Sequence, residues 1–215
     1  MKQYRLLRPD EVECRVSRIT EKGVVLLLYK TARTDADLLD ESVGPENWMN
    51  DFKVIDGTLY GGIGVDYGNG YIWKWDAGTE SNTEAEKGRA SDAFKRAGFK
   101  HGIGRELYSA PFVFIPSGKC NINNGKCYDT FDVADIQYKD ERICYLCITL
   151  KGTPVFEWGE PNTDGKMLCA DCGRPIWDGK KRDGSVWKAA DIATYTSAKY
   201  GKALCIDCAK KATGR

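Results

Sequence analysis

Apolar residues recur along this chain mostly in short runs or at alternate positions, a pattern typical of strands. Asp56-Gly57 and Gly68-Asn69-Gly70, which separate three of these runs, are typical of hairpin turns. The middle of the chain is therefore expected to form an antiparallel meander. The predicted strands cover residues 23–30, 48–55, 59–67, 71–77, 112–115, 128–138, 142–150 and 154–158.

Helical spacing of apolar residues interrupts the strands at three places in the first two thirds of the chain. A short helix is predicted from Pro9 to Ile19, and a second over 34–43, which ends at Gly44. The longest, over 83–100, is followed by Gly102. Because strands and helices do not alternate regularly, we expect an α+β fold in which the antiparallel meander packs on the long helix.

The distribution of charge divides the chain into two parts. The net charge of +1 argues against a dedicated nucleic-acid-binding protein. Residues 165–215, however, hold eleven Lys and Arg against five acids, a charge of +6, which leaves −5 for residues 1–164. The Gly, Pro and Asn residues of 159–164 are typical of a linker. We predict a domain at 1–158 and a small second domain at 165–215.

Hydrophobicity and cysteine usage indicate the compartment. The longest apolar run, residues 24–29, is far too short to cross a bilayer, and no signal-peptide pattern follows Met1. A cytoplasmic protein without a membrane partner is expected. In such a protein an odd number of cysteines, nine, favours metal binding over a disulfide framework.

Two Cys-x2-Cys pairs are the strongest chemical signal. They are Cys169-Ala-Asp-Cys172 and Cys205-Ile-Asp-Cys208, separated by 32 residues that include a helical pattern at 189–200. Four thiolates at this spacing suit tetrahedral Zn²⁺ in a structural site. The alternative, a redox pair, is disfavoured because a second matching pair is present. We predict a four-cysteine zinc finger in the second domain.

The other five cysteines give weaker signals. Cys144 and Cys147 fall in a predicted strand, where a spacing of three directs the sulfurs to opposite faces. Buried strand cysteines are the favoured interpretation, and a second zinc site with Cys120 and Cys127 remains the alternative. Cys14 lies in the first predicted helix and is expected in its core.

The long helix carries two stripes of residues when it is projected at 100° per residue. One is apolar and predicts packing on the sheet; it comprises Ala90, Phe94, Ala97 and His101. His101 is the only histidine, and its place in this stripe favours a packed side chain over a catalytic Cys–His pair. The other stripe is cationic, contains no acid, and comprises Arg89, Arg96 and Lys100, with Lys87 and Lys95 elsewhere around the helix.

The helix sequence also contains the pattern K-x-x-A-S-D-x-F-K-R-A, from Lys87 to Ala97. Together with Gly44-Pro45-Glu46-Asn47-Trp48 and the run Tyr60–Val65, this segment resembles the Rad52 (Rad22) type of single-strand annealing proteins. The segment 73–82 is similar to the phage branch of that group. The resemblance covers roughly residues 8–158, and the cysteine-rich region is an addition to it.

The resemblance implies an ATP-independent DNA-annealing protein that is not an enzyme. Such proteins form rings or helical filaments that hold single-stranded DNA in a basic groove, with the bases exposed to a complementary strand. It further implies a phage protein of recombination and double-strand break repair in the bacterial cytoplasm, with a single-strand binding protein or a phage exonuclease as candidate partners. The Lys-Arg pair of the family helix corresponds to Lys95 and Arg96. Further candidate DNA-binding residues are Arg89, Lys100, Lys87 and Lys74.

Two other classes of function compete with annealing. A zinc-containing nuclease would draw carboxylates from Asp76, Glu80 and Asp92, but no H-E-x-x-H motif is present and four-thiolate zinc is a closed coordination. A protein-interaction adaptor would use the zinc finger as its docking surface. An adaptor has no need for the cationic stripe of the long helix.

Overall fold

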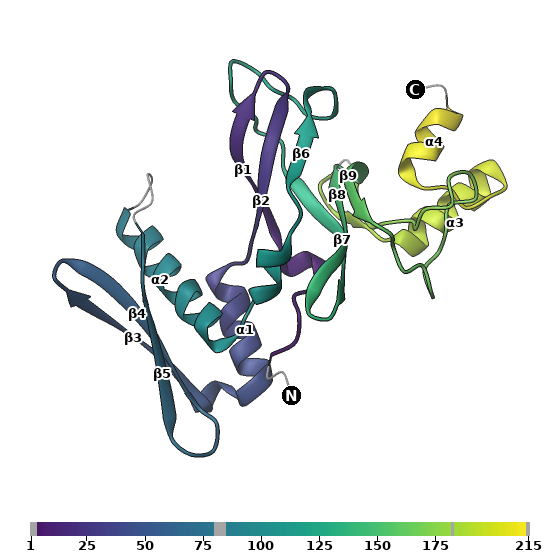
Figure 1. Cartoon of the computed structure of the whole chain (residues 1–215). Coiled ribbons are helices and arrows are strands. Elements are labelled where there is room, and N and C mark those ends of the chain that lie inside the picture. Colours follow the sequence, from purple (N-terminus) through teal and green to yellow (C-terminus); the bar gives the residue numbers. More distant parts are fainter. Residues whose placement is uncertain (1–3, 80–84, 182, 214–215) are drawn as a thin grey trace. The chain divides into compact units, whose positions relative to one another are not determined.

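A computed structural model describes residues 4–79, 85–181 and 183–213, and shows an α+β protein with antiparallel sheets. Contacts divide the chain into two compact units (Figure 1). Unit 1 comprises Met1–Val12 and Tyr29–Ser109, and unit 2 comprises Glu13–Leu28 and Ala110–Arg215. The linker expected at 159–164 lies within unit 2, so the division into 1–158 and 165–215 stays a prediction.

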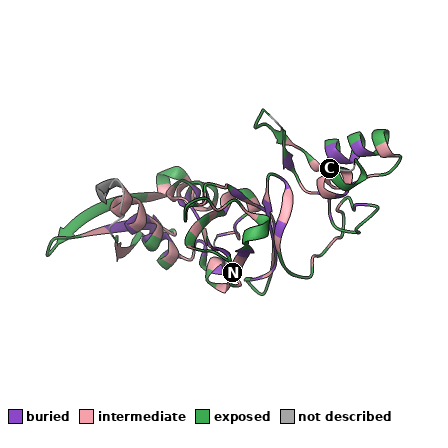
Figure 2. Cartoon of the chain, turned by 90° about the horizontal axis from the view of Figure 1, so that it is seen from above, coloured by how far each residue is buried: buried purple, intermediate pink, exposed green. Residues whose placement is uncertain are grey.

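Unit 1 contains a three-stranded antiparallel sheet and two α-helices. The sheet has the order β3-β4-β5, and β3 and β5 begin and end at the residues that the sequence predicts. β3 is exposed along nearly its whole length (Figure 2). The elements are α1 (Ala32–Val43), β3 (Trp48–Ile55), β4 (Thr58–Asp66), β5 (Tyr71–Ala77) and α2 (Ala85–His101), with short 3-10 helices η1 (Pro9–Glu11), η2 (Pro45–Asn47) and η3 (Arg105–Ser109).

Helix α2 packs closely on β4. Ile63 of β4 and Ala97 of α2 are fully buried. Gly61 permits the approach, because a Cβ atom at this position would lie 2.9 Å from the Cβ of Ala93. Three residues of the predicted apolar stripe are buried, Phe94, Ala97 and His101, and the fourth, Ala90, is half-buried. Ala93 and Gly98 are also buried on α2.

His101 is a packed histidine, as predicted. Its Nε2 lies 2.8 Å from the carbonyl oxygen of Ile63, and its Nδ1 lies 2.9 Å from the hydroxyl of Tyr67. Burial lowers the pKa of His101, so the neutral ring is the favoured form. Both ring nitrogens hold structural hydrogen bonds, which leaves no nitrogen for a catalytic pair.

The helix predicted from Pro9 to Ile19 is wrong. Only η1 is helical there, and β1 (Glu13–Thr20) follows it. The apolar spacing that suggests a helix also fits a strand, since exposure alternates along β1 and β-branched residues are frequent in it. Cys14 is consequently a half-buried strand residue rather than part of a helix core.

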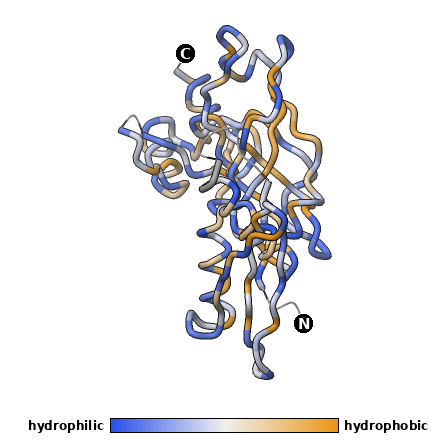
Figure 3. Tube along the Cα trace, turned by 90° about the vertical axis from the view of Figure 1, so that its left-hand side faces the viewer, coloured by the Kyte–Doolittle hydropathy of each residue, from blue (hydrophilic) through white to orange (hydrophobic). Residues whose placement is uncertain are grey.

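Unit 2 contains a six-stranded sheet in the order β6-β2-β1-β7-β8-β9. The pairs β2–β6, β1–β7, β7–β8 and β8–β9 are antiparallel. Hydrophobic residues follow the strands of this sheet (Figure 3), and Val24, Leu26, Ile115, Leu146 and Ile148 are buried in it. The bounds are β2 (Gly23–Tyr29), β6 (Val113–Pro116), η4 (Ser117–Lys119), β7 (Phe131–Lys139), β8 (Arg142–Leu150) and β9 (Thr153–Gly159).

The last part of unit 2 has a small core of its own. It contains β10 (Gly179–Lys180), β11 (Val186–Trp187), α3 (Ala189–Tyr200) and α4 (Ile206–Ala212), and α3 has the predicted bounds. The buried residues are Cys169, Ile176, Ile192, Ala193, Leu204 and Cys208. A core this small needs a further source of stability.

Candidate nucleic-acid interface and metal centre

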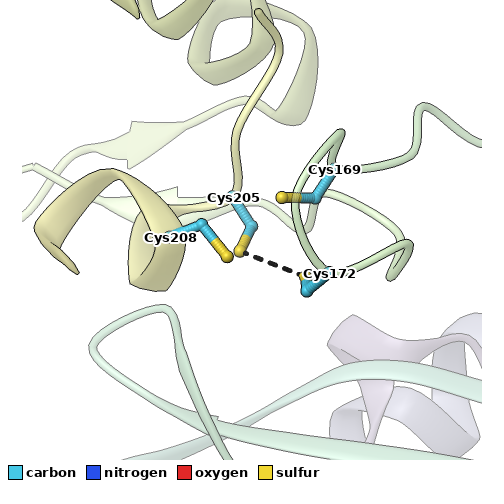
Figure 4. Close-up of side chains that lie close together, drawn as sticks. All are labelled: Cys169, Cys172, Cys205 and Cys208. Carbon is cyan, nitrogen blue, oxygen red and sulfur yellow. Dashed lines mark hydrogen bonds between the residues drawn. The ribbon is translucent and has the colours of Figure 1, made fainter. Parts of the chain in front are cut away.

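The four predicted cysteine ligands come from a tight turn and from the start of α4. In the turn, Cys169 N donates to Arg174 O (2.8 Å) and Gly173 N donates to Cys169 O (2.9 Å). Cys205 is the N-cap of α4, and Cys208 lies in the first turn of that helix. The two local structures direct all four sulfurs to one point (Figure 4).

The geometry of the sulfurs fits a four-coordinate metal ion. All four Sγ atoms lie within 4.8 Å of one another, and those of Cys172 and Cys205 are 3.8 Å apart. A tetrahedral ion with metal–sulfur bonds of about 2.3 Å separates its sulfurs by about 3.8 Å. The cluster predicted from the sequence can therefore hold a metal ion.

The thiols do not ionise equally. Burial raises the pKa of Cys205 to about 11, and burial together with the neighbouring thiols raises that of Cys208 as well. Burial also opposes ionisation of Cys169, but backbone N–H groups of Cys205 and Cys172 lower its pKa to about 7. Four thiolates so close together need a cation to offset their repulsion.

Among the residues that the structure describes, the cluster at 169–208 is the one place where three or more potential metal ligands meet, and the alternative second site is not formed there. Cys120 lies 3.6 Å from Pro116 O, and Cys127 lies 3.9 Å from the carboxylate of Asp129. Cys147 is buried in β8 and Cys144 is half-buried there, in agreement with their prediction as strand residues.

Two cations of α2 meet an acid of β5. The side chains of Arg96 and Lys100, one helical turn apart, are 48% and 46% exposed. Arg96 Nε lies 3.6 Å from Asp76 Oδ1, and Lys100 Nζ lies 3.5 Å from Asp76 Oδ2. Lys100 also donates to Trp75 O (2.5 Å). The cationic stripe therefore has a carboxylate beside it, which the helix sequence alone does not indicate.

More positive charge gathers at the C-terminal end of α2. Lys74 Nζ donates to Lys100 O (3.0 Å), and Arg105 donates through Nη2 to the same carbonyl (2.8 Å). Cations are favoured at this end of a helix because its carbonyl groups are partly negative. Lys74 thus lies beside Lys100, and Arg105 is an additional cation, which lies beyond the end of α2 and so outside the predicted stripe.

The remaining candidates lie elsewhere around α2. The buried pair of Lys30 and Asp35 lies next to Lys95, whose carbonyl oxygen accepts from Lys30 Nζ at 3.3 Å. The side chain of Lys95 is half-buried, and so is Arg89. The side chain of Lys87 and the whole of Glu80 lie outside the described residues. The structure brings together Arg96, Lys100 and Lys74, whereas Lys95 lies beside Lys30 and Asp35, and Arg89 lies two helical turns before Arg96.

The carboxylates proposed for a nuclease are otherwise engaged. Asp76 is held by Arg96 and Lys100, and its Oδ1 accepts from Ala77 N (2.8 Å). Asp92 Oδ2 accepts from Thr79 N (3.0 Å) and Thr79 Oγ1 (2.9 Å). Neither belongs to a metal-ligand cluster within the described ranges.

The sheet face opposite α2 is aromatic. Trp73 and Trp75 of β5 stack with ring centroids 5.3 Å apart, and Lys53 Nζ lies 4.2 Å from the ring centroid of Trp75. The rings lie against Gly64 and Gly62 of β4, where a Cβ would meet them at 2.7 and 2.5 Å. Successive side chains of a strand point to opposite faces of its sheet, so the positions of Trp73 and Trp75, two residues apart, indicate from the sequence that they share a face.

One comparison with known proteins gives a match. Residues 52–119 match the Rad52/22 family double-strand break repair protein, and this segment contains β4, β5 and α2. The match confirms the resemblance for the part of the chain that carries the cationic helix. Neither the curated proteins nor the solved structures contain a match.

Proposed function

We propose that this protein binds single-stranded DNA and anneals complementary strands in recombination and double-strand break repair. The observation that carries the proposal is the coincidence of the family match at 52–119 with the half-exposed cations of α2. We take β3, β4, β5 and α2 as the annealing core, in which the meander supports the DNA-binding helix.

The chemistry requires phosphate binding and no covalent step. Arg96, Lys100 and Lys74 would neutralise backbone phosphates at one end of α2, and Lys95, Arg89 and Lys87 would extend the track along the helix. Contacts to phosphate leave the base edges free to pair and tolerate any sequence. Affinity then comes from counterion release and falls steeply with salt. Neither ATP hydrolysis nor a catalytic residue is needed, so the protein is not proposed as an enzyme.

Self-association would multiply these few contacts into a continuous track. A ring or filament is what the family resemblance implies, and the long exposed strand β3 supports it. A strand at a sheet edge presents backbone groups that can pair with another chain; here Met49, Phe52, Val54 and Ile55 are exposed on it. We place the protein in phages and its action in the bacterial host cytoplasm. In the described part of the chain, no helix is both long and apolar enough to cross a membrane.

The cysteine cluster is proposed as a structural zinc site. When bound, Zn²⁺ supplies four coordinate bonds that hold the turn at 169–172 against the start of α4. This would stabilise residues 165–215 as a domain joined by the linker 159–164 to an annealing domain at 1–158. The formal charge of residues 165–215 is +6, and four thiolates with one Zn²⁺ reduce it to +4, which still favours contact with DNA or an acidic partner.

Docking of a protein partner on the zinc domain is the second candidate function. It is favoured by exposed apolar side chains, since Met167, Leu168, Val186 and Tyr195 are each more than 40% exposed. The family resemblance implies a single-strand binding protein or a phage exonuclease as this partner. Removing residues 165–215 should then leave strand annealing intact and abolish the partner's binding.

Fluorescence anisotropy with a labelled oligonucleotide tests the DNA site. Lys95→Ala combined with Arg96→Ala should weaken single-strand binding and lower the slope of log affinity against log salt by about two. Lys139→Ala with Arg142→Ala removes two exposed cations from the β7–β8 hairpin and serves as the matched control. Equal affinities of the two double variants would refute the proposed site.

A further inference from the structure

Asp76 occupies the position between Arg96 and Lys100 in which an anionic ligand would bind. It lies opposite Gly61 in the register of β4 and β5, on the sheet face that meets α2. Its two carboxylate oxygens contact different cations, Oδ1 the guanidinium and Oδ2 the ammonium. The side chain of Asp76 is 22% exposed, so the group is open to solvent from one side.

These ion pairs are long and open compared with the buried ion pair of unit 1. Charge-assisted hydrogen bonds typically measure about 2.7–2.9 Å, whereas Asp76 lies 3.6 and 3.5 Å from its cations. The buried pair of Lys30 and Asp35 is separated by 2.5 Å. Ion pairs between partly exposed side chains are weak, so another anion can replace the carboxylate at low cost.

A phosphodiester group offers the same recognition features as this carboxylate. Both carry one negative charge over two oxygens, and both suit the planar guanidinium of an arginine. We infer that Asp76 is an internal competitor for the backbone phosphate of single-stranded DNA at Arg96 and Lys100. The inference rests on the proposed function and adds a residue that regulates the strength of the same site.

The competition has a consequence for annealing. A bound phosphate displaces the carboxylate from the two cations, and the freed negative charge then repels the strand. Each contact between a phosphate and these cations is therefore weaker. A bound strand can then shift its register or dissociate while its bases pair with a complementary strand. The opposite role, in which Asp76 orients Arg96 and Lys100 for the strand, predicts the opposite change in affinity when its charge is removed.

Asp76→Asn tests the inference because it removes the charge and nearly preserves the shape. Asp51→Asn is the matched control: Asp51 lies on β3, at the other edge of the sheet, opposite Gly62 and hence on the other sheet face. Its Oδ1 accepts from the next backbone N–H at 2.8 Å, as that of Asp76 does. Asp76→Asn should bind a labelled single strand about threefold to tenfold more tightly than the wild type, as expected from losing two exposed ion pairs. Asp51→Asn should change the affinity less than about twofold, through long-range charge alone.

Two further variants distinguish a failure of the inference about Asp76 from a failure of the proposed DNA-binding function. Asp76→Ala removes the carboxylate without adding an amide and should also tighten binding, with thermal melting used to verify that both variants fold. Arg96→Ala with Lys100→Ala reports on the proposed function. If that variant loses affinity while Asp76→Asn binds no better than Asp51→Asn, the inference alone is overturned. If the wild type does not bind, or the cation variant binds as well as the wild type, the proposed function fails and the inference fails with it.

Discussion

The indole of Trp75 lies flat against the backbone of Gly62 on the neighbouring strand. A Cβ atom at Gly62 would approach the ring carbons of Trp75 to 2.5 Å, closer than real contacts allow. The register of β4 and β5 places the two residues directly opposite each other. The aromatic face of this sheet therefore depends on the absence of a side chain at Gly62.

Gly62→Ala should consequently destabilise the protein. The added methyl group must displace the indole from its stack with Trp73, and overpacking of this kind costs about 1–3 kcal/mol. Urea unfolding followed by tryptophan fluorescence measures the change. Gly118→Ala is the control, because a Cβ there meets nothing within 4 Å. Equal stabilities of the two variants would contradict the described packing.

Metal analysis tests the cysteine cluster. The wild type should contain one zinc ion per chain, and Cys205→Ser should lose it, because three thiolates bind a structural ion much more weakly than four. The zinc-free variant should also melt at a lower temperature in unit 2. Cys14→Ser, a half-buried strand position away from the cluster, should keep its zinc. Full zinc occupancy in Cys205→Ser would rule out the four-thiolate site.

Stability should fall in mildly acidic solution because of His101. Burial lowers the pKa of His101 in the folded protein below its unfolded value of about 6.5. The folded state then binds fewer protons, so its stability is fully present above that unfolded value and is lost as the pH falls through the folded pKa. The free energy of unfolding should be lower at pH 5.5 than at pH 7.5.

His101→Gln identifies the source of that pH dependence. The amide can still hydrogen-bond Ile63 O but does not titrate in this range. The variant should lose part of the difference in stability between pH 7.5 and pH 5.5. An unchanged difference would assign the pH dependence to other groups.

The sequence predicts local structure well where one pattern dominates. The strands β3 and β5 are bounded by turn residues and a short 3-10 helix, and α3 has a clear apolar period, so their ends agree with the prediction. Residues 13–20 fit a helix and a strand equally well, and only pairing with neighbouring strands decides between them. Helix α4 is too short to have a detectable period.

The candidate sites likewise differ in how far local sequence patterns predict them. Spacing alone identifies the four cysteines, because each pair is local and the chemistry of sulfur is specific. The helix projection identifies Arg96 and Lys100, but their contact with Asp76 depends on how β5 lies against α2, which no local pattern encodes. The separation of Lys95 from Arg96 follows from the helix projection itself, whereas the buried Lys30 that donates to Lys95 O is known only from the structure.

The rate of strand annealing is the most direct test of the central claim. Two complementary oligonucleotides, one with a fluorophore and one with a quencher, are mixed with the protein at low salt without ATP or Mg²⁺. Annealing should be faster than in the absence of protein, slower again with Lys95→Ala and Arg96→Ala, and accompanied by an oligomeric mass in solution. No acceleration, together with a monomeric mass, would contradict the account.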